Sequence, residues 1–260
     1  MLHKMNQSEI AREQFNRQAQ RFSDWAVTKN IEYLKAITEF IAPGCEDSLL
    51  DVACGTGDFT LYTSGMLKKA VGIDVADKMI KIAFRQKSEM KIDNVDFRIG
   101  EVSQLPFPAN FFDIVFSKSA FHHFDNASEV FREMVRCSKS NGKIGICDIL
   151  AFENPEVEDY FETFEKLVDI SHHKTLSKQD FVGLFEGNSL KLERMFEIEI
   201  EHTISEYLGH AIQNKENDSR IDRLIDRSKT NETIGEFWTF GKSREDTKFR
   251  KKVILLLGRK

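Results

Sequence analysis

The stretch that most constrains this chain is residues 49–61, which read LLDVACGTGDFTL. It opens with a short apolar run, as a strand buried on both faces does: Leu49, Leu50 and Val52. Gly55 and Gly57 then form a turn, and we interpret Asp58, which precedes a new apolar segment, as the N-cap of a helix. A strand, a glycine turn and a helix N-terminus form a site where a ligand lies directly against the backbone.

Three classes of ligand use such a turn. A phosphate-binding P-loop needs Gly-Lys-Ser/Thr, but here Gly57 is followed by Asp58. A dinucleotide fingerprint needs a third small residue where Thr60 stands, and Asp58 would face the negative pyrophosphate. S-adenosylmethionine (SAM) carries a sulfonium cation and no phosphate, so an acidic residue beside the turn is compatible with it. The turn therefore favours SAM over the two phosphate ligands.

Residues 51–57, Asp-Val-Ala-Cys-Gly-Thr-Gly, resemble motif I of the class I SAM-dependent methyltransferases. The most similar variant is that of the ubiquinone- and menaquinone-biosynthesis C-methyltransferases and their relatives (methyltransferase type 11), where alanine often replaces the first glycine, as Ala53 does here. Leu-Pro-Phe-Pro at 105–108 and Phe112-Asp113 before an apolar run also match this subgroup. The resemblance covers residues 45–150 well and the C-terminal hairpin loosely.

Alternating strands and helices from residue 48 to 150 predict parallel βαβ units in a doubly wound α/β sheet. After the first strand, further strands are expected at 70–74, 95–99, 111–117 and 143–150, with a helix at 127–137 and a turn at Asn141-Gly142. A long strand at 190–204 and a last strand at 252–257 follow, among helical segments. The resemblance implies that these two strands close a mostly parallel, Rossmann-like sheet as an antiparallel hairpin.

We expect a single domain over residues 1–260. Its SAM-binding core spans 45–150, and residues 151–260 add substrate-cap helices and the hairpin. Residues 9–41 read as helical with a break near Ser23-Asp24, and the resemblance implies that residues 1–41 fold over the cofactor as a lid. Phe22 stands where the family has a tyrosine, either above the cofactor or in ordinary core packing. Among later helices, Asp77 and Ser177 are candidate N-caps.

Asp74 follows the apolar run of the second expected strand. In a nucleoside-binding Rossmann-like fold an acid at this position reaches the ribose hydroxyls, although it could instead cap a loop. The resemblance implies that Glu101 accepts a hydrogen bond from the adenine amino group and that Val102 contacts the ring. It also implies a wider set of cofactor contacts: Asp51, Ala53, Gly55, Thr56, Gly57, Val75, Met79, Ser117, Lys118 and Phe22.

His122 and His123 leave the carboxyl end of the fourth expected strand, which faces the ligand crevice in an open α/β sheet. Imidazole titrates near neutral pH, so either is a candidate general base. The alternative is that one packs under the cofactor and the other fixes the loop. Four aromatic or histidine residues further on could line a substrate cavity or belong to the core: Tyr207, His210, Phe237 and Trp238.

The composition is that of a globular protein, with 41% hydrophobic and 30% charged residues. A net charge of −5 argues against nucleic-acid binding. No apolar run is long enough to span a membrane, and the four cysteines lack the spacing of a zinc site or a disulfide framework, which fits the cytoplasm. We expect a small-molecule methyl acceptor as the partner, no nucleic acid and no stable membrane insertion, and we leave homodimer formation open.

The predicted function is therefore methyl transfer from SAM to carbon or oxygen of a small molecule, for which a quinone-like ring is one candidate. The expected product is S-adenosylhomocysteine, and no metal is expected. Three alternatives stay open. A nicotinamide-dependent oxidoreductase shares the fold class, but Asp58 and Thr60 disfavour it. A non-catalytic SAM-binding protein is compatible with the same fold. An RNA methyltransferase would need a basic patch or recognition domain, and neither is visible.

Overall fold

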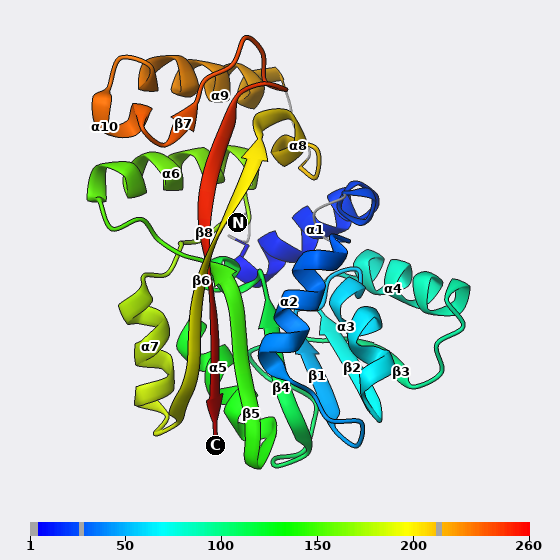
Figure 1. The fold of residues 1–260 in the computed structure, drawn as a ribbon. Helices are drawn as coiled ribbons and strands as arrows, with labels where there is room; N and C mark the ends of the chain where they lie inside the picture. Colours follow the sequence, from blue (N-terminus) through cyan, green and yellow to red (C-terminus); the bar gives the residue numbers. More distant parts are fainter. Residues whose placement is uncertain (1–4, 26–28, 212–214) are drawn as a thin grey trace.

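An eight-stranded mixed sheet organises the chain, and the computed structural model describes residues 5–25, 29–211 and 215–260 (Figure 1). The sheet order is β3-β2-β1-β4-β5-β8-β6, and β7 pairs with β8 beside this path. The strand bounds are β1 Ser48–Val52, β2 Lys69–Asp74, β3 Val95–Ile99, β4 Phe112–Lys118, β5 Ser138–Ile149, β6 Lys191–Thr203, β7 Trp238–Thr239 and β8 Lys248–Arg259.

The first five strands are parallel, while β8 pairs antiparallel with both β5 and β6. This arrangement confirms the predicted fold class, a doubly wound, mostly parallel sheet with an antiparallel C-terminal pair. Leu49 and Leu50 point to opposite faces of the sheet, and both are buried, as the continuous apolar run predicted. The order reverses between β1 and β4, and the carboxyl ends of strands at such a point form a ligand crevice.

Helices cover both faces of the sheet. On one face α2 and α4 share a core cluster with the strands, and on the other α5 and α7 do so. The helix bounds are α1 Gln7–Asp24, α2 Ile31–Ile41, α3 Asp58–Thr63, α4 Asp77–Glu89, α5 Ala127–Cys137, α6 Pro155–Val168, α7 Lys178–Gly187, α8 Ile204–Leu208, α9 Lys215–Ser228 and α10 Glu232–Gly235, with short 3-10 turns η1 Ser64–Met66 and η2 Phe121–His123.

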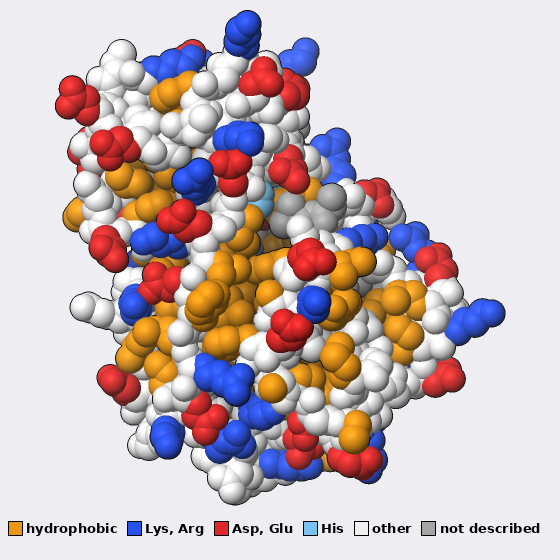
Figure 2. Space-filling model, in the orientation of Figure 1, with side chains coloured by type: hydrophobic (Ala, Val, Ile, Leu, Met, Phe, Trp, Pro, Cys, Tyr) orange, Lys and Arg blue, Asp and Glu red, His pale blue; other side chains and the backbone are white. Residues whose placement is uncertain are grey.

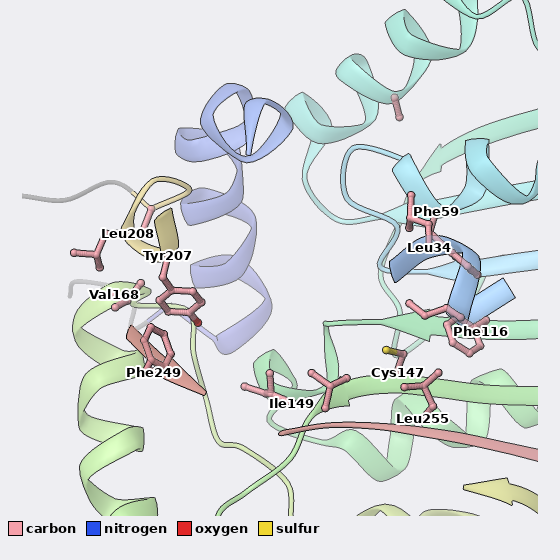
Figure 3. Close-up of a cluster of buried hydrophobic side chains, with 14 of the residues drawn as sticks. Leu34, Phe59, Phe116, Cys147, Ile149, Val168, Tyr207, Leu208, Phe249 and Leu255 are labelled. Carbon is pink, nitrogen blue, oxygen red and sulfur yellow. The ribbon is translucent and has the colours of Figure 1, made fainter. Parts of the chain in front are cut away.

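Beyond the parallel strands, α6, α8, α9, α10 and β7 gather around the far ends of β6 and β8 (Figure 1). We call these five elements the cap. Figure 3 shows that one buried cluster runs from the sheet, at Phe116 and Leu255, past Ile149 to Tyr207 and Phe249 beside the cap. The cap and the sheet therefore share a continuous hydrophobic core.

The outer strand β6 leaves large apolar side chains at the surface. Phe196 is 57% exposed and Met195 is 41% exposed. Figure 2 shows hydrophobic side chains gathered where β6 and β8 cross the middle of this face. Among the residues that the structure describes, no helix combines the length and the apolar character that crossing a bilayer requires.

Several local predictions need correction. Gly57 is the N-cap of α3 and Asp58 is its first helical residue, because Gly57 has a left-handed conformation, which cannot continue a helix, and Asp58 is already helical. Ala76, not Asp77, is the N-cap of α4, while Asp77 binds Lys81 and Asn16 through its carboxylate. Asn141 lies inside β5 with a φ of 64° rather than in a turn before it. Ser177 caps α7 in a capping box, as predicted.

Candidate functional site

A cavity of about 600 Å³ lies at the carboxyl ends of the parallel strands. The turn after β1 and the residues that end β2 and β4 line it from one side, and α1 lines it from another. This volume is in the range of pockets that hold drug-sized ligands and cofactors. The α1 residues in the lining are Gln7, Ser8, Glu9, Ala11, Arg12, Phe15 and Phe22.

The turn after β1 carries three left-handed residues in close succession: Ala53 at φ 58°, Gly55 at φ 55° and Gly57 at φ 80°. The backbone N–H of Cys54 donates to the carbonyl of Ile73 on β2, which fixes the turn to the neighbouring strand. A Cβ atom on Gly55 would lie 3.7 Å from Cε1 of Phe22, so this ring lies directly over the turn. The turn thus presents bare backbone to a cavity that Phe22 covers.

Gly57 is required to be glycine by close packing and not by exposure to the cavity. A Cβ atom there would lie 2.6 Å from Cζ of Phe97 and 3.0 Å from Cβ of Ala83. Gly57 is buried behind the turn and is not among the residues that line the cavity. Its role is to let α3 begin close against β3 and α4.

Asp74 is buried at the end of β2 and lines the cavity. Its Oδ2 accepts a hydrogen bond of 2.8 Å from the Gly55 N–H, and its Oδ1 accepts one of 2.8 Å from the Ala76 N–H. Burial raises the pKa of Asp74, against the effect of these backbone donors. Each carboxylate oxygen has two lone pairs, so both keep capacity for a ligand hydroxyl.

Asp51 is the second buried acid in the lining, and it is 1% exposed. Burial raises the pKa of Asp51 to about 7, although the Thr60 hydroxyl donates to its Oδ2 at 2.6 Å and Lys118 lies nearby. A cation placed in the cavity near Asp51 would favour the ionised carboxylate.

Glu101 stands at the rim of the cavity and is exposed. The Ser8 hydroxyl of α1 donates a 2.6 Å hydrogen bond to its Oε2, which joins the helix to the segment after β3. Asn16 of α1 also donates to Asp77 at the start of α4. These bonds hold α1 over the cavity.

Most of the predicted cofactor residues line this cavity: Asp51, Ala53, Gly55, Thr56, Asp74, Val75, Met79, Glu101, Val102, Lys118 and Phe22, together with His123. Ser117, by contrast, is fully buried, and its hydroxyl donates to the carbonyl of Val52 in β1 at 2.9 Å. Its side chain joins two strands and does not line the cavity. Phe15 was not predicted, although its helical spacing to Phe22 was a usable signal.

A second cavity, of about 110 Å³, lies beside the first. The two share wall residues, namely Phe15, Phe22, Lys118, Ser119 and His123. The rest of the second wall comes from the end of α1, from α2, η2, the end of β5, α6 and the loop after it, β6, α8 and the loop after it, and β8. These residues are Trp25, Tyr33, His122, Ile149, Glu165, Asp169, His172, Ile200, His202, Tyr207, His210, Lys251 and Val253. Tyr207 and His210 thus line a cavity, whereas Trp238 is buried in the core against Tyr160.

The two predicted histidines differ in their partners. His122 lines only the second cavity, and its Nδ1 lies 2.5 Å from Oδ1 of the buried Asp148. Burial alone would lower the pKa of His122, but the Asp148 carboxylate outweighs it and the pKa is raised. The Nδ1 of His123 lies 3.0 Å from the Ser171 carbonyl. Burial and then the nearby His122 lower the pKa of His123 to about 4, so it is neutral at pH 7.

Charged groups that were not predicted complete the second cavity. The Tyr207 hydroxyl donates to both oxygens of Glu165, and Lys251 donates to this hydroxyl at 2.6 Å. Gln18 of α1 donates to Asp169. These residues are scattered along the chain, so no local motif marked them. Asp148 is an acid near the end of a strand, as Asp74 is, and the same signal would have identified it.

Neither cavity suggests a metal site: within residues 5–25, 29–211 and 215–260, no group of three or more His, Cys, Asp or Glu side chains is arranged to hold a metal ion.

One protein-family model matches part of this chain. Residues 50–146 match the model of the family described as "Methyltransferase domain" (Methyltransf_11). The chain is 28% identical over 176 residues to "Uncharacterized methyltransferase YcgJ" of Bacillus subtilis, covering 68% of this chain and 70% of that protein. A demethylmenaquinone methyltransferase of Listeria welshimeri is 27% identical over 175 residues, covering 63% of this chain and 73% of that protein. Other demethylmenaquinone methyltransferases are matched over about half of their length.

Solved structures show the same fold. The crystal structure of YcgJ superposes with a TM-score of 0.80 at 24% identity, covering 87% of this chain and 97% of that chain. A geranyl diphosphate C-methyltransferase from Streptomyces coelicolor, solved with Mg²⁺, geranyl diphosphate and S-adenosyl-L-homocysteine, gives a TM-score of 0.60 at 12% identity, covering 88% of this chain and 77% of that chain. At these identities the likeness establishes the fold.

Proposed function

We propose that this chain, whose residues 50–146 match the model of the "Methyltransferase domain" family, transfers the methyl group of SAM to a small organic molecule. The observation that carries the proposal is the larger cavity, where bare backbone at Gly55 and the buried carboxylates of Asp51 and Asp74 meet at the strand ends. Buried acids suit a sulfonium cation and ribose hydroxyls, whereas they would repel a pyrophosphate.

The residues of the larger cavity have distinct roles in this proposal. Asp74, held by the Gly55 and Ala76 N–H groups, accepts hydrogen bonds from the ribose hydroxyls. Glu101 accepts one from the adenine amino group, beside Val102. Asp51 and Lys118 lie toward the methionine part of the cofactor. This division follows the resemblance to the family and is compatible with the order of these residues along the strand ends.

When SAM is bound, its sulfonium supplies an activated methyl carbon, and the protein aligns the acceptor and excludes water. Phe15 and Phe22 of α1 line both cavities and place apolar surface beside the reacting groups. In this arrangement residues 5–25 and 29–41 serve as the lid, residues 45–150 as the cofactor core, and residues 151–211 and 215–260 as the acceptor side of one domain. The rest of the expected lid and cap, residues 1–4, 26–28 and 212–214, lies outside the described residues. The name of the demethylmenaquinone relatives supports a quinone-like ring as the acceptor.

Isothermal titration calorimetry with SAM, and with NADH in a parallel experiment, tests the cofactor. We expect micromolar binding of SAM and no heat from NADH. NADH binding without SAM binding would replace the proposal with an oxidoreductase. Release of S-adenosylhomocysteine in the presence of an acceptor would then separate an enzyme from a non-catalytic SAM-binding protein.

A further inference from the structure

The second cavity has the features of an acceptor site. It shares Phe15, Phe22 and His123 with the cavity assigned to SAM, so a group bound in it lies next to the methyl donor. Its volume of about 110 Å³ is smaller than the ~150 Å³ of an apolar cavity that holds benzene. The second cavity alone is therefore tight for one small ring, and a ring bound there would extend past the shared wall toward the larger cavity.

The wall of the second cavity is chemically mixed. Aromatic side chains, including Trp25 stacked on His210 at 4.3 Å between ring centroids, suit a planar ligand. Its charged groups balance, with Lys118 and Lys251 against Glu165 and Asp169. A buried site whose charges already balance favours a neutral ligand, because an added charge would lack a partner.

His122 faces this cavity with one ring nitrogen available. Its Nδ1 is bound to Asp148, and no described residue forms a hydrogen bond with its Nε2. Asp148 is itself held by three backbone donors, the N–H groups of Ala120, Phe121 and Ile149. The carboxylate fixes the tautomer with the proton on Nδ1, which leaves the lone pair of Nε2 directed away from Asp148.

We propose that the second cavity binds the methyl acceptor, a neutral single-ring compound with a phenolic or enolic hydroxyl, and that His122 removes the hydroxyl proton through Nε2 while Asp148 positions its ring. This inference rests on the proposed function. The acceptor O–H proton moves to Nε2, and the oxygen attacks the methyl carbon of SAM. The carbon–sulfur bond breaks with its electron pair going to sulfur. The products are a methyl ether and S-adenosylhomocysteine, and the proton on His122 then leaves to solvent.

A phenol needs such a base because its pKa, ~10 as for tyrosine, leaves it protonated at pH 7. His123 is a weaker base than His122, since its pKa is lowered to about 4. The pair His122–Asp148 is therefore the stronger proton acceptor of the two histidines.

The test uses the full chain, SAM labelled in its methyl group, and two acceptors, hydroquinone and 4-nitrophenol. 4-Nitrophenol is substantially ionised near neutral pH and needs no base. Its charge should weaken its binding in this site, so kcat is compared at saturating acceptor. We expect His122→Gln to lower kcat with hydroquinone by about 100-fold but to change kcat with 4-nitrophenol far less. His173→Gln is the matched control, because His173 is exposed and lines neither cavity, and it should retain full activity.

Three results would overturn the inference. An equal loss with both acceptors would give His122 a structural role. Absence of a labelled product from both phenols, in wild-type protein that binds SAM, would remove phenols as the acceptor class while leaving the proposed function intact. Absence of SAM binding by the wild-type protein would overturn both.

Asp148→Asn tests the positioning role through the pH profile of kcat. Because a general base must be neutral, wild-type activity should rise with pH through an inflection above the 6.5 of free imidazole. The groups that face His122 are Asp148, His123, His172, Glu165 and Lys251. Removing the Asp148 charge should move the inflection to lower pH, whereas an unmoved inflection would show that Asp148 does not act on His122.

Discussion

The backbone N–H of Gly55 donates a 2.8 Å hydrogen bond to the carboxylate of Asp74, 19 residues further along the chain. This bond joins the turn after β1 to the end of β2, its parallel neighbour. The acid therefore orients the backbone of the turn and, through its remaining lone pairs, faces the same cavity. Loss of its side chain affects the shape of the turn and its ligand contacts together.

We accordingly expect Asp74→Ala to weaken SAM binding at least tenfold, about 1.4 kcal/mol, as measured by calorimetry. Asp96→Asn on the neighbouring strand β3 is the control, because Asp96 does not line the cavity. Unchanged affinity in a folded Asp74→Ala protein would remove Asp74 from the cofactor site.

A second expectation concerns pH. The pKa of Asp51 is raised to about 7 by burial, so this carboxyl is largely protonated at about pH 6. Binding of a sulfonium cation favours the ionised form, and so SAM binding should release a proton and become tighter as pH rises toward about 7, with little change above it. Calorimetry in buffers of different ionisation enthalpy measures the release. Asp51→Asn should abolish the pH dependence; a dependence that persists in this variant would come from another group.

Gly57→Ala should destabilise the fold by about 2–5 kcal/mol, because the residue has a φ of 80° and its new Cβ would overlap the Phe97 ring. Gly65→Ala is the matched control, since a Cβ there meets no atom within 4 Å. Urea denaturation compares the two midpoints. Similar midpoints would mean that Phe97 moves aside without cost.

Substitution at Ala53 should have the opposite effect on the free energy of unfolding. At φ 58° it bears a left-handed strain of about 1–2 kcal/mol, which glycine would remove at the cost of a more flexible unfolded chain. Ala53→Gly should therefore leave the free energy of unfolding unchanged or raise it by about 1 kcal/mol. Ala36→Gly, at an exposed position inside α2, should lower it by about 1 kcal/mol. Equal losses in the two variants would contradict strain at Ala53.

The parallel sheet and most of the larger cavity followed from the sequence, because local signals coincide there. The apolar run to Val52, the glycine turn and the strand-end acid Asp74 occupy positions that parallel strands bring to one edge. Asp58 was misplaced by one residue, since the conformation of Gly57, and not the capping propensity of aspartate, decides where α3 begins.

The second cavity could not be predicted from the sequence. Its wall combines Tyr33 from α2, Glu165 from α6 and Lys251 from β8, which only the tertiary fold brings together. Glu165 and Lys251 are charged residues inside an apolar cluster, and each is buried because the other and Tyr207 satisfy it. Pairing of this kind depends on three distant segments and leaves no periodic pattern.

The position of α1 has a kinetic consequence. Phe15 and Phe22 line both cavities, so a displacement of α1 would alter the walls of both at once. Entry of the cofactor and entry of the acceptor are then not independent events. A molecule bound on the acceptor side that fixes α1 in place would slow both the release of S-adenosylhomocysteine and the binding of SAM. The same movement of α1 would then limit turnover for both ligands.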